Sequence, residues 1–361
     1  MSWEPRFTLE ARTARALMRI EGARTAIEGL PVTPQLLASL RQSARLLATH
    51  YSTQIEGNQL TPEQVAAVAK GGATPGRERD AAEVRHYLLA LEEMERLAAQ
   101  GGELTEREVR QIHGLVLRGQ SRATPWRDGQ NVIRNSTDNA IIYLPPEAKD
   151  VPSLMTELLA WTNENLADEH WPVPVVAACW HCQFATIHPF YDGNGRTARL
   201  LTNLILHRHG YALKGLYSLE EYYARSLAGY YAALAIGPPN YYMGRAEADL
   251  SPFLSYFCQG MADALESVQR QATQPARNAV PDRAASLRRL TPPQRQVMTF
   301  FTHQQTASAA ELASHMGLTP RQATTLCLRW NAEGFLEMAN VSRKARRYRL
   351  ADEWERLAAG G

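Results

Sequence analysis

The clearest pattern along the chain is the recurrence of apolar residues every three or four positions, which is the spacing of amphipathic helices. Capping residues, glycines and prolines mark many of the points where these segments begin or end. Up to about residue 271, the pattern predicts helices over residues 33–55, 61–68, 77–98, 105–117, 151–165, 174–187, 196–209, 219–235 and 252–271. Segments of this length with short connections predict a mainly α-helical bundle.

Two short runs between the helices have the composition of strands instead. Residues 130–134 and 140–144 are extended in pattern, and turn-forming residues separate them, namely Asn135, Ser136, Asp138 and Asn139. The segment therefore predicts a small β-hairpin inserted in the bundle.

The composition changes after residue 269. The sequence RQATQPARNAVPD is poor in apolar residues and contains two prolines, as expected of a linker. Beyond it, the pattern predicts helices over residues 292–303 and 308–315, and a third helix capped by Thr319 with Pro320 at its first position. This is helix-turn-helix spacing, and two short strands around a basic tip follow it. We therefore divide the chain into residues 1–104, 105–269, a linker at 270–287, and 288–361.

Composition limits the classes of protein to which the chain can belong. A hydrophobic fraction of 45% and a net charge of +2 over 361 residues suit a globular protein and do not demand nucleic acid as a partner. Residues 282–361 hold 12 Lys and Arg against 7 Asp and Glu, which is +5, so the preceding residues carry −3. No run of 18 apolar residues and no signal-peptide core appear, so we expect a cytoplasmic protein that does not enter a membrane. Cys179 and Cys182 form one CxxC around His181, which we interpret as buried core residues rather than a metal or redox site.

Candidate chemistry is concentrated in the run HPFYDGNGRTAR, residues 188–199. Gly193 and Gly195 are separated by one residue, and two such glycines allow successive backbone N–H groups to converge on an anionic oxygen. The run opens a predicted helix, whose N-terminal amides and dipole favour the same anion. Arg196 and Arg199 lie three residues apart on that helix, so both guanidinium groups can point at one polyphosphate.

Two further side chains of this run suit catalysis. Asp192 precedes the glycines and is suited to hold Mg²⁺, which binds through one or two carboxylates together with substrate phosphates. An unperturbed histidine titrates near neutral pH, so His188 suits a general base. A GNG sequence alone is a turn in most proteins, and a lone surface histidine is usually only solvated. The combination at fixed offsets favours a phosphate-handling site.

The run resembles the signature loop of Fic-domain proteins, in which a histidine, a phenylalanine, an acid, GNGR and a second arginine stand at fixed offsets. The pattern is complete in His188, Phe190, Asp192, Gly193, Asn194, Gly195, Arg196 and Arg199. The resemblance implies a Fic-type helical bundle with its catalytic core at residues 105–269. It also implies an enzyme that transfers AMP from ATP, with Mg²⁺, to a Ser, Thr or Tyr hydroxyl of a target protein.

The roles of the family carry over to these positions by resemblance. His188 is expected to deprotonate the target hydroxyl, and Asp192 to hold Mg²⁺. The second arginine of the loop is expected to bind the γ phosphate of ATP, while the other nucleotide-binding positions cradle the α and β phosphates. The expected ATP-binding residues are Gly193, Asn194, Gly195, Arg196 and Arg199. Transfer of another phosphorylated group remains an alternative within the family.

An upstream segment, YSTQIEGNQLT, resembles the Fic inhibitory motif, with Ser52, Glu56 and Gly57 at the matching positions. In the family this glutamate pairs with the second arginine of the loop. We therefore expect a contact between Glu56 and Arg199 that keeps the γ phosphate from its productive position. An ordinary exposed glutamate at a helix end is the alternative. In some members the glutamate helps water to remove AMP from a modified target, so removal, or both activities, stays open.

The predicted hairpin resembles the flap of Fic proteins, which pairs with the target as an added strand. Ile133 and Ile142 are expected to clamp a target side chain, with a plain surface hairpin as the alternative. Downstream of the loop, an aromatic cluster is a candidate adenine pocket, although such a stripe more often belongs to the core. Its members are Tyr222, Tyr223, Tyr230 and Tyr231.

Residues 288–361 resemble a winged-helix domain. Its third helix is expected to expose Arg321, Gln322, Thr325 and Arg329, and its wing tip carries Arg343, Lys344, Arg346 and Arg347. These residues suit DNA binding, chiefly through phosphates, which would make the protein a regulator. Protein docking is the alternative, because a balance of +5 is modest for a DNA-binding domain. A second copy of the chain, in a homodimer, is a further candidate partner.

Overall fold

The computed structural model of this chain describes residues 3–30, 34–134, 140–241, 244–273, 290–301, 304–340, 346–351 and 354–355. The chain divides into two compact units, Met1–Thr273 and Gln274–Gly361. The finer boundaries expected near residues 104 and 287 stay predictions. Within the described ranges, no helix combines the length and apolar character needed to cross a bilayer.

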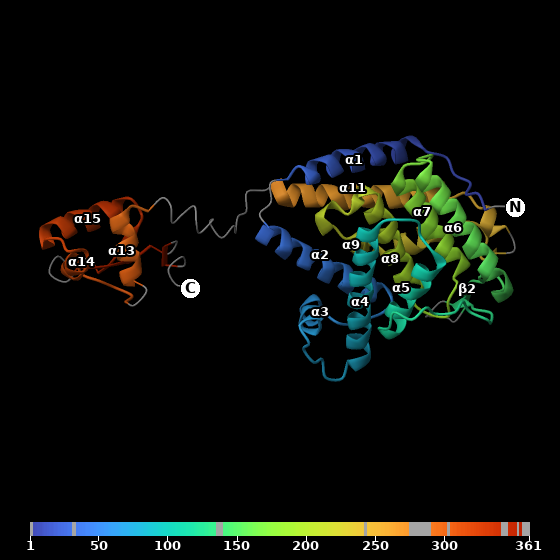
Figure 1. The fold of residues 1–361 in the computed structure, drawn as a ribbon, viewed down its shortest axis with the longest axis horizontal. Helices are drawn as coiled ribbons and strands as arrows, with labels where there is room; N and C mark the ends of the chain where they lie inside the picture. Colours follow the sequence, from blue (N-terminus) through green and yellow to red (C-terminus); the bar gives the residue numbers. More distant parts are fainter. Residues whose placement is uncertain are drawn as a thin grey trace. The chain divides into compact units, whose positions relative to one another are not determined.

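The first unit is built of helices, as the sequence predicts, with one small hairpin among them (Figure 1). Its helices are α1 (Ala11–Glu28), α2 (Pro34–Ile55), α3 (Pro62–Ala69), α4 (Glu78–Gln100), α5 (Glu106–Arg118), α6 (Val151–Ala167), α7 (Val173–Ile187), α8 (Asn194–Leu206), α9 (Leu219–Arg225), α10 (Leu227–Leu234) and α11 (Ser251–Thr273). Short 3-10 turns occur at Ala148–Asp150, Leu213–Gly215 and Arg245–Glu247. Helix α8, which begins in the signature loop, packs against α7, α4 and α5.

Helix α8 is buried along almost its whole length. Its apolar residues Leu200, Leu201, Leu204 and Ile205 are each at most 1% exposed. A helix buried on all sides lies in the core of its domain. The two arginines of the signature loop are therefore carried by a rigidly packed element.

Reciprocal caps fix the starts of two helices. Thr61 accepts a hydrogen bond from the N–H of Gln64, whose side chain accepts from the N–H of Thr61. Thr105 and Glu108 form the same capping box at the start of α5. Such a box satisfies two N–H groups that would otherwise lack partners. Both helices begin within one residue of their predicted starts.

The structure contains a helix that the sequence analysis does not predict. Helix α1 buries Thr13, Ala16, Ile20, Ala23 and Ile27, which have helical spacing. Three of these five side chains are alanine or threonine, so the apolar signal of the face is weak. The small side chains let α1 lie closely along α11 (Figure 1).

The single helix predicted over residues 219–235 is wrong, because the segment forms two helices. Ser226, between α9 and α10, has φ −139° and ψ 69°, outside the helical region. The apolar pattern continues across this break because both helices pack against α11. Periodicity alone therefore gives no sign of it.

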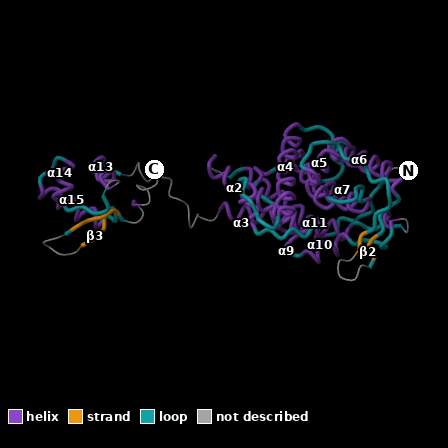
Figure 2. Tube along the Cα trace, turned by 90° about the horizontal axis from the view of Figure 1, so that it is seen from below, coloured by secondary structure: helices purple, strands orange, loops and turns teal. Residues whose placement is uncertain are grey.

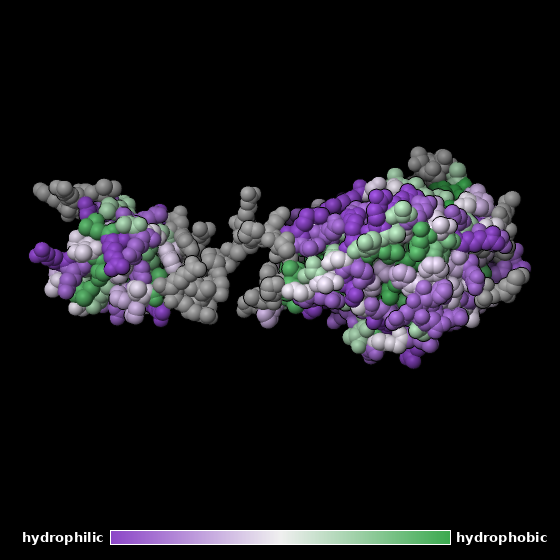
Figure 3. Space-filling model, turned by 90° about the horizontal axis from the view of Figure 1, so that it is seen from above, coloured by the Kyte–Doolittle hydropathy of each residue, from purple (hydrophilic) through white to green (hydrophobic). Residues whose placement is uncertain are grey.

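The hairpin between α5 and α6 consists of β1 (Ile133–Arg134) and β2 (Ile141–Tyr143). The strands are antiparallel, with Ile133 opposite Tyr143 and Arg134 opposite Ile141, so the register shifts by one residue. The predicted turn, residues 135–139, lies outside the described residues. Figure 2 shows the hairpin at the edge of the helical unit. The face of this unit shown in Figure 3 mixes polar residues with scattered hydrophobic ones, as the surfaces of globular proteins do.

The second unit has its own core. Its elements are α13 (Pro292–Phe301), α14 (Ala309–Met316), α15 (Pro320–Ala332), β3 (Leu336–Asn340) and β4 (Arg347–Leu350). Leu312, Trp330, Phe335 and Tyr348 are buried among them. Thr319 caps α15 with Pro320 in its first turn, as predicted. The order of three helices and a hairpin is the predicted one, while the assignment as a winged helix stays a prediction. Arg343 and Lys344 of the expected tip lie outside the described residues.

Candidate active site

The signature loop begins where α7 ends. His188 is the C-terminal cap of α7 and has φ 51° and ψ 60°, in the left-handed region that non-glycine residues seldom adopt. Its N–H donates to the carbonyl of Phe184 at 2.9 Å. Backbone strain of this kind concentrates at functional sites. Here it turns the chain out of the helix and into the loop.

Asn194 closes the loop on itself. Its Oδ1 accepts from the N–H of Phe190 at 3.0 Å, and its Nδ2 donates to the carbonyl of Phe190 at 2.8 Å. The residue is 3% exposed, so its amide group is committed to the loop. Any phosphate contact of Asn194 is therefore expected from its backbone N–H, which is a narrower role than the resemblance implied.

His113 of α5 holds the loop from a neighbouring helix, and the sequence analysis missed it. Its ring stacks on Phe190 with centroids 3.5 Å apart and planes at 7°. Its Nε2 lies 2.8 Å from the carbonyl oxygen of Asp192. A carbonyl can only accept, so Nε2 carries the proton. Burial lowers the pKa of His113 to about 4, so the ring stays neutral and anchors the loop without adding charge.

Arg127 joins the loop to the hairpin segment, and it was missed as well. It is 2% exposed, and its Nε donates to the carbonyl of His188 at 2.9 Å. Its Nη1 donates to the carbonyl of Gly129 at 3.1 Å. Because one planar guanidinium binds both carbonyls, the base of the hairpin and the start of the loop are fixed together.

The side chain of His188 is neutral at physiological pH. Burial lowers its pKa to about 4, while the hydrogen bond to the carbonyl of Ala185 and the nearby charge of Glu56 act in the opposite direction. The carbonyl accepts the ring N–H, so the other ring nitrogen carries the lone pair. His188 is thus in the protonation state that a general base needs.

Asp192 places an exposed carboxylate in the same loop. Its Oδ1 accepts from the N–H of Gly193 at 2.6 Å and from Nη2 of Arg196 at 3.2 Å. The side chain is 65% exposed. One accessible carboxylate fits Mg²⁺, which takes its other ligands from water and substrate phosphates. Among the described residues, no three His, Cys, Asp or Glu side chains form a metal cage, so this substrate-dependent mode is the one that fits.

The first turn of α8 already faces an anion, and that anion is Glu56. Gly193 has φ 75° and stands at the N-terminal cap of the helix. A Cβ added to Gly195 would lie 2.3 Å from Oε1 of Glu56, so only glycine permits this approach. The first N–H groups of a helix lack partners within it, and the helix dipole favours negative charge there. The Glu56 carboxylate therefore stands where the loop is expected to hold a phosphate.

Arg199 is the partner of Glu56 that the resemblance implied. Its Nη2 donates to Oε1 of Glu56 at 2.8 Å. Its Nε and Nη2 donate to the Oγ and the carbonyl of Ser52 at 2.8 and 2.9 Å. The Arg199 side chain is 1% exposed and that of Glu56 27%. Burial alone would lower the pKa of Arg199, but Glu56 raises it above its ordinary value. The expected contact is present, and Ser52 of α2 together with Glu56, the residue after this helix, accepts three hydrogen bonds from this arginine.

Arg196 has a partner that the sequence analysis missed. Its Nη1 contacts Oε1 of Glu83 on α4, while its Nη2 contacts Asp192. The Arg196 side chain is 8% exposed and that of Glu83 20%. Each arginine of the loop is thus paired with a carboxylate from a different upstream helix or helix end.

Known proteins match the same stretch of the chain. A family model described as "Fic/DOC family" matches residues 103–206, which hold the whole loop and α8. The crystal structure of a Fic family protein from Desulfovibrio desulfuricans G20 aligns with 97% of this chain and 99% of that chain. Its TM-score is 0.66 at 25% sequence identity. This chain contains a Fic domain.

Curated relatives match a longer part of the chain than the family model does. The protein adenylyltransferase Fic of Drosophila willistoni is 29% identical over 199 residues, which are 55% of this chain and 39% of that protein. The protein of the same name from Drosophila grimshawi is 30% identical over 199 residues, or 55% of this chain and 40% of that protein. The match therefore spans about two fifths of the length of these relatives.

The hairpin of the Fic domain presents apolar side chains to solvent. Ile141 and Ile142 are 55% and 50% exposed, whereas Ile133 is half-buried. Tyr191 of the loop is also exposed, and its hydroxyl donates to Asp128, ahead of the hairpin, at 2.6 Å. This surface suits an extended peptide. The clamping roles of Ile133 and Ile142 stay predictions.

Two of the four tyrosines of the candidate adenine pocket are core residues. Tyr223 and Tyr230 are each 2% exposed and stack with centroids 4.7 Å apart. The burial of both rings leaves little of either ring accessible to a base, and their assignment to the adenine pocket stays a prediction. Tyr231 is 48% exposed and its hydroxyl donates to the carbonyl of Ile55 at 3.4 Å. Tyr222 is half-buried, so Tyr231 is the most exposed of the four, and its role in the pocket stays a prediction.

The CxxC of the Fic domain is structural, as interpreted from the sequence. Cys179 and Cys182 are free thiols, each 1% exposed, and burial raises the pKa of both. His181 between them is fully buried, with its Nδ1 3.0 Å from Oγ1 of Thr202 and its Nε2 2.8 Å from the hydroxyl of Tyr230. These groups belong to the core beneath α8.

A polar cavity of about 380 Å³ adjoins the loop. Its lining includes Glu56, Asn58, Glu83, Asp192 and Arg196. The cavity therefore brings two charged residues of the loop, Asp192 and Arg196, together with Glu56 and Glu83.

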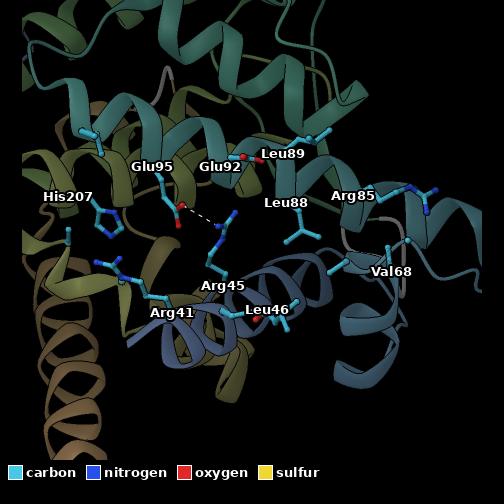
Figure 4. Close-up of a pocket in the computed structure, with 18 residues that line it drawn as sticks. Arg41, Arg45, Leu46, Val68, Arg85, Leu88, Leu89, Glu92, Glu95 and His207 are labelled. Atoms are coloured by element: carbon cyan, nitrogen blue, oxygen red, sulfur yellow. Dashed lines mark ion pairs between the residues drawn. The ribbon is translucent and has the colours of Figure 1, made fainter. Parts of the chain in front are cut away.

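A larger cavity of about 1150 Å³ opens between α2 and α4, and none of the described residues that line it belongs to the loop. Figure 4 shows Arg41 and Arg45 of α2 on one side of it and Glu92 and Glu95 of α4 on the other. Arg45 and Glu95 form an ion pair at 3.5 Å with both side chains more than a third exposed. The residues that line this cavity lie outside the signature loop. Mutations of its charged residues are therefore suitable controls for mutations in the loop.

Proposed function

We propose that this protein is a protein adenylyltransferase, which transfers AMP from ATP, with Mg²⁺, to a Ser, Thr or Tyr hydroxyl of a target protein. The observation that carries the proposal is the arrangement of one loop. Neutral His188, exposed Asp192 and the N-terminus of α8 with Arg196 and Arg199 supply a base, a metal ligand and an anion site. Catalysis of phosphoryl and nucleotidyl transfer depends mostly on positioning the reactants and on electrostatic stabilisation of the transition state, and these groups would provide both. The name of the fly relatives, protein adenylyltransferase, supports the same reaction.

The proposed reaction needs few protein groups. The oxygen of the target hydroxyl attacks the α phosphorus of ATP while His188 accepts the hydroxyl proton. The new P–O bond forms as the bond from the α phosphorus to the bridging oxygen breaks, and pyrophosphate leaves with its electron pair. Mg²⁺ held by Asp192 would neutralise part of the phosphate charge. The first N–H groups of α8 and Arg196 would hold the α and β phosphates, and Arg199 the γ phosphate.

Glu56 would inhibit this reaction. Its carboxylate lies against Gly195 and pairs with Arg199 at 2.8 Å. A γ phosphate that binds Arg199 must first displace it. ATP bound with Glu56 in place would have its α phosphorus out of line with the incoming hydroxyl. The proposed enzyme is therefore autoinhibited.

The proposal is tested with ATP labelled at one phosphorus at a time. Glu56→Gly protein, with Mg²⁺ and a mixture of cellular proteins, should attach the α label to protein and release the γ label as pyrophosphate. Asp192→Asn in the same background should reduce the α labelling strongly, because the metal loses its ligand. Transfer of the γ label to protein would contradict the proposal and indicate phosphorylation.

Removal of AMP is a second activity that the same pocket supports. Glu56 lies within reach of the loop, so its carboxylate could activate a water that attacks the α phosphorus of an AMP-modified target. Loss of AMP from a modified target in the wild type, but not in Glu56→Gly, would favour removal or a two-way enzyme. Nucleotides other than ATP, offered in the same labelling assay, test whether another group is transferred.

DNA binding by the second unit stays a separate prediction. Arg321 and Thr325 are exposed on α15. Arg329, however, pairs with Glu333 at 2.7 Å, and Arg347 pairs with Glu311 at 3.3 Å. Carboxylates that already neutralise these arginines weaken the electrostatic case for DNA and favour a protein partner. A cytoplasmic location and a homodimer also stay predictions.

A further inference from the structure

Arg196 is held between two carboxylates that come from distant parts of the chain. Its Nη1 contacts Oε1 of Glu83 in the second turn of α4, and its Nη2 lies 3.2 Å from Oδ1 of Asp192 in the loop. Arg196 is 8% exposed at its side chain and Glu83 20%. The guanidinium therefore has a fixed orientation rather than the freedom of a surface arginine.

Glu83 is itself oriented by the segment that follows α2. Its Oε2 accepts from Nδ2 of Asn58 at 2.8 Å. Asn58 is 5% exposed, and its Nδ2 also donates to the carbonyl of Asp80 at 3.0 Å. Its Oδ1 accepts from the N–H of Leu60 at 3.1 Å. The buried amide thus fixes one oxygen of Glu83 and leaves the other for Arg196.

The two nitrogens of Arg196 have different surroundings. The Nη1 contact is with a packed helix, while the Nη2 contact is with Asp192, whose carboxylate is 65% exposed. If Asp192 turns to Mg²⁺, Nη2 becomes available to a phosphate oxygen while Glu83 still holds Nη1. A guanidinium has enough N–H donors to bind both at once.

We propose that Glu83 is a positioning residue that holds Arg196 ready for the nucleotide phosphates, with Asn58 fixing Glu83. This proposal rests on the proposed function, since it assigns the phosphates to the cavity that Glu83, Asp192 and Arg196 line together. Glu83 differs from Glu56 in what it contacts. The Glu56 carboxylate lies against Gly195 at the start of α8, whereas Glu83 contacts the arginine side chain. Glu83 therefore supports nucleotide binding, and Glu56 opposes it.

The test compares carboxylate-to-amide changes in the Glu56→Gly background. Glu83→Gln should weaken binding of Mg·ATP about tenfold in titration calorimetry, because Arg196 loses a charge-assisted partner. In AMP transfer it should raise KM for ATP by a similar factor and change kcat less. Glu92→Gln is the matched control, since Glu92 lies on the same helix but faces the larger cavity (Figure 4). It should leave both values unchanged.

A second background tests whether Glu83 acts through Arg196. In protein that already carries Arg196→Ala, Glu83→Gln should weaken ATP binding no further. Asn58→Ala, which keeps both charges, should weaken ATP binding in the same direction by a smaller factor. Thermal unfolding of each variant identifies any loss caused by misfolding, and Asn58→Ala then carries the test if Glu83→Gln does not fold.

Equal or tighter ATP binding in Glu83→Gln would overturn the proposal, because Glu83 would then be a competitor of the phosphates or a bystander. A further loss on top of Arg196→Ala would also overturn it. Failure of the proposed function is distinguishable from both results. In that case no variant transfers AMP, while the calorimetric comparison of Glu83→Gln with Glu92→Gln still decides the role of Glu83.

Discussion

The ion pair between Glu56 and Arg199 has an energy that can be predicted and measured. The perturbation is Glu56→Gln, which keeps the shape of the side chain and removes its charge. Exposed ion pairs contribute about 0–1 kcal/mol, and breaking a fully buried pair costs about 3–5 kcal/mol. Here the arginine is 1% exposed, the glutamate 27%, and the distance 2.8 Å. Arg199 also keeps two hydrogen bonds to Ser52. The coupling energy should therefore be about 2 kcal/mol.

A double-mutant cycle measures that coupling. It uses wild type, Glu56→Gln, Arg199→Met and the double variant in urea unfolding followed by tryptophan fluorescence. Five of the seven tryptophans, Trp3, Trp126, Trp161, Trp171 and Trp180, belong to the first unit, so the signal reports mainly its unfolding. The exposed pair of Arg45 and Glu95 is the control cycle and should give less than about 1 kcal/mol.

The same energy sets the effect of Glu56 on nucleotide binding. If the γ phosphate must displace Glu56 from Arg199, Glu56→Gln should tighten binding of Mg·ATP by up to about 30-fold, which corresponds to about 2 kcal/mol. A coupling energy near zero would refute the reasoning, because the pair would then behave like a surface contact. So would a coupling of about 2 kcal/mol without any gain in ATP affinity, because Glu56 and the γ phosphate would then not compete.

Three further predictions concern proton equilibria and the second unit. AMP transfer by Glu56→Gly should change little between about pH 6 and 8 and fall only toward pH 4, because His188 with a pKa of about 4 is already a free base; a half-loss near pH 6.5 would contradict this. Burial lowers the pKa of His181 to about 3 and that of His113 to about 4. Below the ordinary pKa of histidine, the unfolded chain therefore binds more protons than the folded one. The free energy of unfolding should fall by about 2 kcal/mol per histidine between pH 7 and 5. An unchanged urea midpoint at pH 5 would oppose that account. If the second unit binds DNA, Arg321→Ala should lower the salt slope of binding by about 1 in a titration at several salt concentrations, and an unchanged slope would remove Arg321 from the interface.

Sequence patterns predicted the parts of the site that lie within one stretch of chain. The spacing of His188, Asp192, Arg196 and Arg199 is set by a loop and the first turns of one helix, so local geometry follows from local sequence. The contact between Arg199 and Glu56 joins residues 143 positions apart. The spacing of residues along the sequence does not predict a contact over such a separation, and only the resemblance to a known family predicted it.

The missed residues reach the loop from other elements. His113 comes from α5, Arg127 from the segment before the hairpin, and Glu83 from α4. Each is an ordinary polar residue in its own segment, and its function arises only when the helices pack. Tyr223 and Tyr230 show a different limit of sequence analysis. Aromatic residues at helical spacing have the same sequence pattern in a hydrophobic core and in a ligand pocket. Only the structure shows that these two rings pack against His181 and that their helices pack against α11.

The most direct test of the account is the intact mass of the purified full chain after incubation with Mg·ATP. The comparison uses wild type, Glu56→Gly, and Glu56→Gly combined with His188→Ala. The account predicts that Glu56→Gly gains the mass of one or more AMP groups, that wild type gains little, and that the double variant gains none. Equal labelling of wild type and Glu56→Gly would contradict inhibition by Glu56. Labelling that survives His188→Ala would contradict its role as the base.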